Sequence, residues 1–173
     1  MYTISQSRLQ AGYAYASQGQ FKIAEQLLEH CQAPYCKRQY VGSINLQRRA
    51  CCMGLTMSSR DAAQRHMVQS RSSELCALTA QLCTIFREAF PSLKFSSTQI
   101  NVNSRSIMHA DSGNVGHSAV VAFGQFAGGQ LFTVSAEGCP VIHNPAGEVI
   151  LINGRLPHAV LPFAGYEAPF ALF

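Results

Sequence analysis

The clearest periodic pattern in the chain is an apolar stripe between Ser72 and Phe90. Its members are Leu75, Leu78, Leu82, Phe86 and Phe90. Intervals of three and four residues place these side chains on one face of an α-helix. Pro91 follows the stripe directly, and proline both lacks a backbone N–H and disfavours helix in the residue before it. The pattern therefore predicts a helix over residues 72–90.

After Pro91 the pattern changes to short runs of β-branched and aromatic residues separated by turn residues. These runs cover residues 97–102, 118–123, 129–134, 148–152, 158–162 and 169–173. Short strands at close spacing predict a sandwich or barrel, and the glycine pair Gly128-Gly129 predicts a hairpin turn between two of them. With helices confined to the N-terminal half, the fold class expected is α+β.

The first 36 residues have a helical pattern over residues 7–36 that is interrupted at Gln18-Gly19-Gln20, which predicts a helical hairpin. Its small and bulky positions resemble those of one tetratricopeptide repeat; they are Gly12, Tyr15, Gly19, Phe21, Ala24 and Leu28. A single repeat cannot bury its own apolar face. We therefore expect residues 1–36 to pack against a domain formed by residues 37–173, or to be left over from a longer parent protein. Residues 38–68 are expected to form an edge strand or loops.

Composition narrows the class of protein. Of the 173 residues, 47% are hydrophobic and 13% are charged, which excludes a disordered chain and suits one buried core. The formal charge of +4 is too small for a protein that holds duplex DNA by electrostatics alone. Seven cysteines without a paired CxxC pattern indicate reduced thiols inside a cell, and no apolar run has the length of a membrane span. We expect a soluble intracellular protein, in nucleus or cytoplasm, whose oligomeric state the sequence does not define.

Three residues have side chains of the types that form a metal site: His109, Asp111 and His158. Residues two apart in a strand point to the same side, so His109 and Asp111 can reach one metal, and His158 would come from a neighbouring strand. Two imidazoles and one carboxylate on one face of an octahedron leave three positions open, which suits iron(II). Gly116 would relieve crowding near this metal, and Asn114 would either hydrogen-bond the loop of Asp111, orient a cosubstrate oxygen, or cap a turn.

The sequence around these residues resembles the TET/JBP branch of the iron(II) and 2-oxoglutarate-dependent dioxygenases over about residues 96–173. The shared positions are His109, Asp111, Asn114, Gly116, Ser118, Gly124, Phe126, Gly128, Gly129, Leu131 and, at the distal end, His158. The resemblance implies a double-stranded β-helix (jelly-roll) core, Fe(II) as cofactor, 2-oxoglutarate as cosubstrate, and hydroxylation of a C–H bond. The family precedent for the substrate is the methyl group of a pyrimidine in DNA, which must be flipped out of the duplex.

The chain departs from this family at the residue that binds the far carboxylate of 2-oxoglutarate. The family places an arginine about ten positions after the distal histidine, whereas here Glu167 and Ala168 occupy that region. Three explanations stay open: another arginine, Arg105 or Arg155, binds the carboxylate; ascorbate replaces 2-oxoglutarate; or the chain has lost activity. Other pocket candidates are Asn101 and Asn103, which would alternate toward one side of a strand, together with Asn114.

Two other classes of protein compete with a dioxygenase. The first is a non-catalytic metal-binding module that recruits partners through the helical hairpin. The second is a cupin-like metal protein, which we rank last because cupins usually supply three or four ligands at a different spacing. His117 and His143 have no partner at ligand spacing, so we expect them to be surface or core residues.

Overall fold

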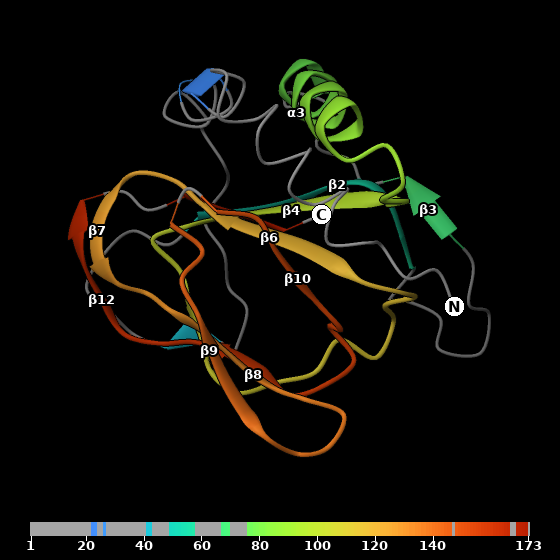
Figure 1. Cartoon of the computed structure of the whole chain (residues 1–173). Coiled ribbons are helices and arrows are strands. Elements are labelled where there is room, and N and C mark those ends of the chain that lie inside the picture. The colour runs from blue at the N-terminus through green and yellow to red at the C-terminus, as the bar shows by residue number, and fades with distance from the viewer. Residues whose placement is uncertain are drawn as a thin grey trace. The chain divides into compact units, whose positions relative to one another are not determined.

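The computed structural model describes residues 22, 23, 26, 41–42, 49–57, 67–69, 76–146, 148–166 and 169–172. Backbone contacts divide the chain into two compact units, one containing residues 51–99 and the other containing residues 33–50 and 100–172. Most of the regular elements among the described residues are strands, and helix α3 lies between β3 and β4 in the sequence (Figure 1). The helical hairpin expected at residues 7–36 lies outside the described residues, apart from the helical positions 22, 23 and 26.

The first unit contains helix α3 (Cys76–Ala89) and strand β3 (Met67–Gln69). Two further strands, β2 (Arg49–Met57) and β4 (Ser97–Val102), are shared between the units. The first two residues of β2 and the second half of β4 belong to the second unit. The predicted helix is confirmed, and its buried side chains follow the helical period at Leu82, Ile85, Phe86 and Ala89. Phe90 closes the helix with its N–H on the Phe86 carbonyl, one residue before Pro91. Strand β2 pairs with β3 in antiparallel register.

The second unit contains the remaining strands. They are β1 (Val41–Gly42), β5 (Arg105–Ser106), β6 (Ser118–Ala122), β7 (Gln125–Gly128), β8 (Leu131–Val134), β9 (Pro140–His143), β10 (Ile150–Ile152), β11 (His158–Val160), β12 (Phe163–Tyr166) and β13 (Pro169–Leu172). All six runs predicted as strands after Pro91 form strands, although most are shorter than the runs themselves. Strands β5, β7, β9 and β12 were not predicted.

Strands of the second unit alternate between two sheets as the chain proceeds. One sheet contains β10, β6 and β13 as neighbours, and the other has the order β11-β8-β9; β7 pairs separately with β12 (Figure 1). The chain thus passes from β6 to β8 and β9 in the other sheet, back to β10, across again to β11, and back to β13. This repeated crossing is the topology of a jelly roll.

Apolar side chains from both sheets meet in the core of the second unit. Val120 on β6 and Ile152 on β10 pack with Leu131 on β8, and Val160 on β11 joins them. All five residues of β6 are buried, so neither face of this strand is open to solvent. The uninterrupted Ala-Val-Val-Ala sequence of β6 suits that position.

The hairpin predicted at Gly128-Gly129 is not formed. β7 ends at Gly128 and pairs with β12, whereas β8 pairs with β11 and β9, so the glycines connect two different sheets. Both glycines have positive φ (86° and 70°), and a Cβ on Gly128 would lie 2.5 Å from the Pro162 carbonyl oxygen. Glycine is therefore favoured at these two positions by the positive φ, and at residue 128 also by the nearby Pro162 backbone, and not by a hairpin turn.

In the part of the chain that the structure describes, no helix is long and apolar enough to cross a membrane.

A pair of substitutions separates the two reasons for glycine at residue 128. Gly138 also has positive φ (82°) but has open space where a Cβ would lie. We expect Gly138→Ala to lower the free energy of unfolding by about 1 kcal/mol through backbone strain alone. Gly128→Ala adds a clash with backbone, so a loss of about 2–4 kcal/mol is expected. Urea unfolding of both variants measures the difference, and equal losses would contradict the clash.

Candidate metal centre

The candidate metal centre lies in the second unit, where two backbone hydrogen bonds join His109 to His158. The His109 N–H donates to the His158 carbonyl (3.0 Å), and the His158 N–H donates to the His109 carbonyl (2.9 Å). The two residues form an isolated antiparallel bridge at the start of β11. Directly paired residues carry their side chains on the same face, so both imidazoles project to one side. Their ring centroids are 4.3 Å apart.

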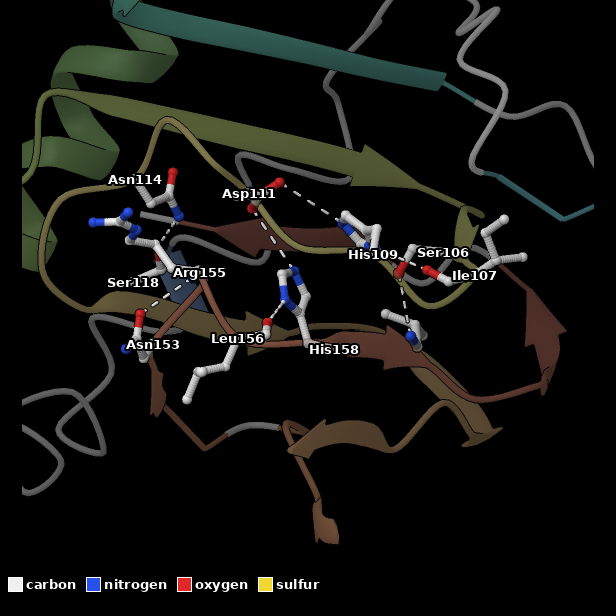
Figure 2. Close-up of polar contacts among 11 residues, drawn as sticks. Ser106, Ile107, His109, Asp111, Asn114, Ser118, Asn153, Arg155, Leu156 and His158 are labelled. Carbon is white, nitrogen blue, oxygen red and sulfur yellow. Dashed lines mark hydrogen bonds and ion pairs between the residues drawn. The ribbon is translucent and has the colours of Figure 1, made fainter. Parts of the chain in front are cut away.

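The Asp111 carboxylate faces both imidazoles from one side (Figure 2). Its Oδ1 is 3.8 Å from His109 Nε2, and its Oδ2 is 3.7 Å from His158 Nε2. One ligand atom from each of the three residues lies within 4.8 Å of the others. The side chain of His158 is 7% exposed, whereas that of Asp111 is 35% exposed, so the group has a buried side and an open side. The three residues singled out in the sequence are thus brought together.

Each imidazole is oriented by a backbone carbonyl two residues earlier in the chain. His109 Nδ1 lies 2.8 Å from the Ile107 carbonyl, and His158 Nδ1 lies 2.9 Å from the Leu156 carbonyl. A carbonyl oxygen only accepts, so each Nδ1 carries a proton and donates it. In a neutral ring the lone pair then belongs to Nε2, the atom that faces Asp111. Sequence reasoning missed these carbonyls because every residue type supplies one.

The loop after Asp111 is held by short-range hydrogen bonds. The Asn114 N–H donates to the Asp111 carbonyl (3.1 Å), and the Asn114 side-chain amide donates to Ser118 Oγ (3.0 Å). The backbone N–H and the side-chain amide of Asn114 therefore both stabilise this loop. Gly116 does not relieve crowding, since a Cβ there would meet nothing within 4 Å; its φ of +84° is what favours glycine.

The asparagines before the centre are placed differently from the strand alternation expected. Strand β4 ends at Val102, and Asn103 is buried with φ 51°, a left-handed conformation that asparagine tolerates better than most residues. Asn101, inside β4, is half-buried. The two amides therefore do not share the regular alternation of one strand.

The candidate arginines occupy different environments. Arg155 is exposed, and its side chain extends away from the three ligand atoms (Figure 2). Arg105 is half-buried on β5, and its Nε is buried without a hydrogen-bond partner among the described residues. Ser106, the next residue, accepts a hydrogen bond from the Val160 N–H of β11, so the strand of Arg105 runs beside the strand of His158. Glu167 and Ala168 lie outside the described residues.

Two other histidines, His117 and His143, lie among the described residues and are not part of the triad. His117 is exposed. His143 Nε2 lies 3.0 Å from Thr133 Oγ1, and Thr133 is the direct cross-strand partner of His158. Burial lowers the pKa of His143 and outweighs the opposing effect of the Glu148 carboxylate. A polar pair, Thr133 and His143, thus lies on the same face of its sheet as the His158 imidazole.

No protein-family model matches the sequence, and a search of curated proteins finds no relative. Solved structures do match. An oxidoreductase of the 2OG-Fe(II) oxygenase family from Burkholderia pseudomallei is 18% identical with a TM-score of 0.54, over 99% of this chain and 91% of that chain. A prolyl hydroxylase from Trichoplax adhaerens, in complex with a hypoxia inducible factor peptide fragment, is 14% identical with a TM-score of 0.56, over 98% and 93%.

A third match is NgTET1 in complex with 5mC DNA, which is 15% identical with a TM-score of 0.53, over 92% of this chain and 67% of that chain. The TM-scores of these three structures are similar, so they do not favour the TET/JBP branch over the others. Together they show that this chain has the jelly-roll fold of the 2OG-Fe(II) oxygenases.

Proposed function

We propose that His109, Asp111 and His158 bind one iron(II) ion and that the chain is an iron(II)-dependent dioxygenase that hydroxylates a C–H bond. The observation that carries this proposal is the convergence of two Nε2 atoms on one carboxylate, with both Nδ1 atoms committed to carbonyls. The jelly-roll fold shared with 2OG-Fe(II) oxygenases supports it.

The donor set fits this metal. Two neutral imidazole nitrogens and one carboxylate are the ligands of non-haem iron sites that keep open positions. Bound iron(II) would supply the redox chemistry and the open positions for a chelating cosubstrate and dioxygen. The chain supplies the rest: the Ile107 and Leu156 carbonyls fix the imidazole protons on Nδ1, and the burial of His158 excludes water from one side.

For the cosubstrate we favour a 2-oxo acid, with Arg105 as the group that binds its far carboxylate. Among the described residues the buried Nε–H of Arg105 has no hydrogen-bond partner, and a carboxylate oxygen would satisfy it with a charge-assisted hydrogen bond. Its strand runs beside β11, which carries His158. Ascorbate is the alternative cosubstrate, because Glu167 stands in the region where the family resemblance places an arginine.

For the substrate we propose a modified pyrimidine in nucleic acid. The resemblance of residues 100–132 to the TET/JBP branch supports it. A net charge of +4 is compatible with a nucleic-acid substrate. A second candidate function is a non-catalytic metal-binding module, which Glu167 favours because an acid there would repel a cosubstrate carboxylate.

Removal of the carboxylate tests the metal site. We expect Asp111→Ala to weaken iron(II) binding by more than about 100-fold, because loss of mere outer-shell partners already costs 10–100-fold. Anaerobic titration of the apoprotein measures this affinity. Glu137→Ala removes a carboxylate that is fully exposed and is the matched control. Unchanged affinity in Asp111→Ala would sink the ligand assignment.

The cosubstrate proposal is tested by the visible charge-transfer band that a chelated 2-oxo acid gives with iron(II). The wild type should show this band with 2-oxoglutarate and also with pyruvate, which lacks the far carboxylate. We expect Arg105→Gln to weaken the binding of 2-oxoglutarate about tenfold or more, because a hydrogen bond to a charged group is lost. The affinity for pyruvate should be unchanged.

Arg155→Gln is the control for this experiment, since it removes an exposed arginine directed away from the ligand atoms. An equal effect of the two substitutions would reject Arg105 as the carboxylate group. A band that fails to form with any 2-oxo acid, while iron still binds, would leave ascorbate or the non-catalytic module.

The substrate proposal is tested with DNA duplexes that differ only in methylated cytosine. We expect the iron-loaded protein to oxidise the methylated duplex, detected by mass spectrometry of the released nucleosides, and to leave the unmethylated duplex unchanged. The Asp111→Ala variant should be inactive on both. If the active protein consumes 2-oxoglutarate without oxidising the methylated base, the substrate is not this pyrimidine.

A further inference from the structure

One turn contacts two of the three proposed ligands. It runs from Asn153 to Leu156 and is closed by the Leu156 N–H on the Asn153 carbonyl (3.0 Å). The Arg155 N–H also donates to Asn153 Oδ1 (3.1 Å), a local bond typical of asparagine in turns. From this turn the Gly154 carbonyl accepts the Asp111 N–H (2.8 Å), and the Leu156 carbonyl accepts His158 Nδ1 (2.9 Å). The backbone of Asp111 and the imidazole of His158 are thus tied to one turn.

Asn114 fixes the loop of Asp111 against this turn. A Cβ on Gly154 would lie 2.4 Å from Asn114 Nδ2 and 3.6 Å from Ser118 Oγ, so the Asn114 amide occupies the space that a larger residue would need. That amide donates to Ser118 Oγ, and Ser118 is the cross-strand partner of Ile152, next to the turn. Asn114, Ser118 and Asn153 lie together on one side of the triad (Figure 2).

We propose that Asn114 and Gly154 form a positioning pair that sets the place of the Asp111 carboxylate relative to His158. Asn114 needs the small residue at 154 to reach Ser118, and the Asp111 N–H needs the loop in this place to reach the Gly154 carbonyl. Neither residue touches the metal in this proposal. It rests on the proposed metal site, and it gives Asn114 a role other than cosubstrate binding.

The pair predicts a specific pattern of non-additivity. Asn114→Ala removes the bond to Ser118. Gly154→Ala leaves the backbone unstrained, but its Cβ displaces the Asn114 amide, which is the movable end of a side chain. Both variants therefore lose the same bond. In the double variant Asn114→Ala/Gly154→Ala the clash is gone, so it should be no worse than Asn114→Ala alone.

The test uses cobalt(II) as a spectroscopic probe of the site in the full chain. We expect each single variant to weaken cobalt(II) binding about tenfold, within the range for partners that orient metal ligands. The visible ligand-field bands should shift, because the carboxylate binds from a different position. Thermal melting of the apoproteins shows whether the variants fold, and Ser118→Ala should reproduce the cobalt affinity and spectrum of Asn114→Ala.

The controls are chosen for chemical likeness. Asn144→Ala removes an exposed asparagine whose Oδ1 accepts the Ala146 N–H, and Gly113→Ala places a Cβ in open space inside the loop of Asp111. Both should match the wild type in affinity and spectrum. Effects that add in the double variant, or single variants that match these controls, would overturn the positioning pair.

Failure of the metal site itself gives a different result. If the wild type binds cobalt(II) no better than Asp111→Ala, the proposed ligands are wrong and the positioning pair falls with them. If the wild type binds and Asp111→Ala does not, the metal site stands, and the single and double variants compared with their controls decide the inference.

Discussion

The antiparallel bridge between His109 and His158 is the constraint on which the centre depends. Each of its two hydrogen bonds contributes about 1 kcal/mol to stability. Together they hold two segments that are distant in the sequence side by side, with His109 directly opposite His158. The chain leaves His109 into the loop of Asp111, and it enters β11 at His158 from the turn that receives the Asp111 N–H. Loss of the bridge would separate both imidazoles and the carboxylate at once.

The jelly roll gives this bridge its rigidity. Because the chain crosses repeatedly between two sheets, His158 begins a strand that is flanked by β8, while residues of the other sheet pack across the core at Val120 and Ile152. A strand fixed on one side by hydrogen bonds and on one face by packing has little freedom to move. His158 therefore lies on a supported strand, whereas the loop of Asp111 requires hydrogen bonds of its own.

Much of the fold could be predicted from local pattern, and the failures have physical causes. The stripe ending at Phe90 and the β-branched runs from residue 97 onward carry their own periodicity. Strand β9 begins with a proline and its first three residues are exposed, so it has no apolar alternation to recognise. Strand β7 is short and ends in glycine, and it is a strand only because β12 pairs with it. Pairing between distant segments is not a local property.

Spacing in a strand places His109 and Asp111 on one side, whereas no spacing rule links them to the distant His158, whose choice the family resemblance strengthened. The carbonyls that orient the rings have no signature in the sequence. Those carbonyls belong to Ile107 and Leu156, and any amino acid at these two positions would present the same oxygen. Mutational drift at residues 107 and 156 can therefore proceed without disturbing ring orientation. A centre oriented by backbone atoms can thus keep its geometry while the sequence around it diverges.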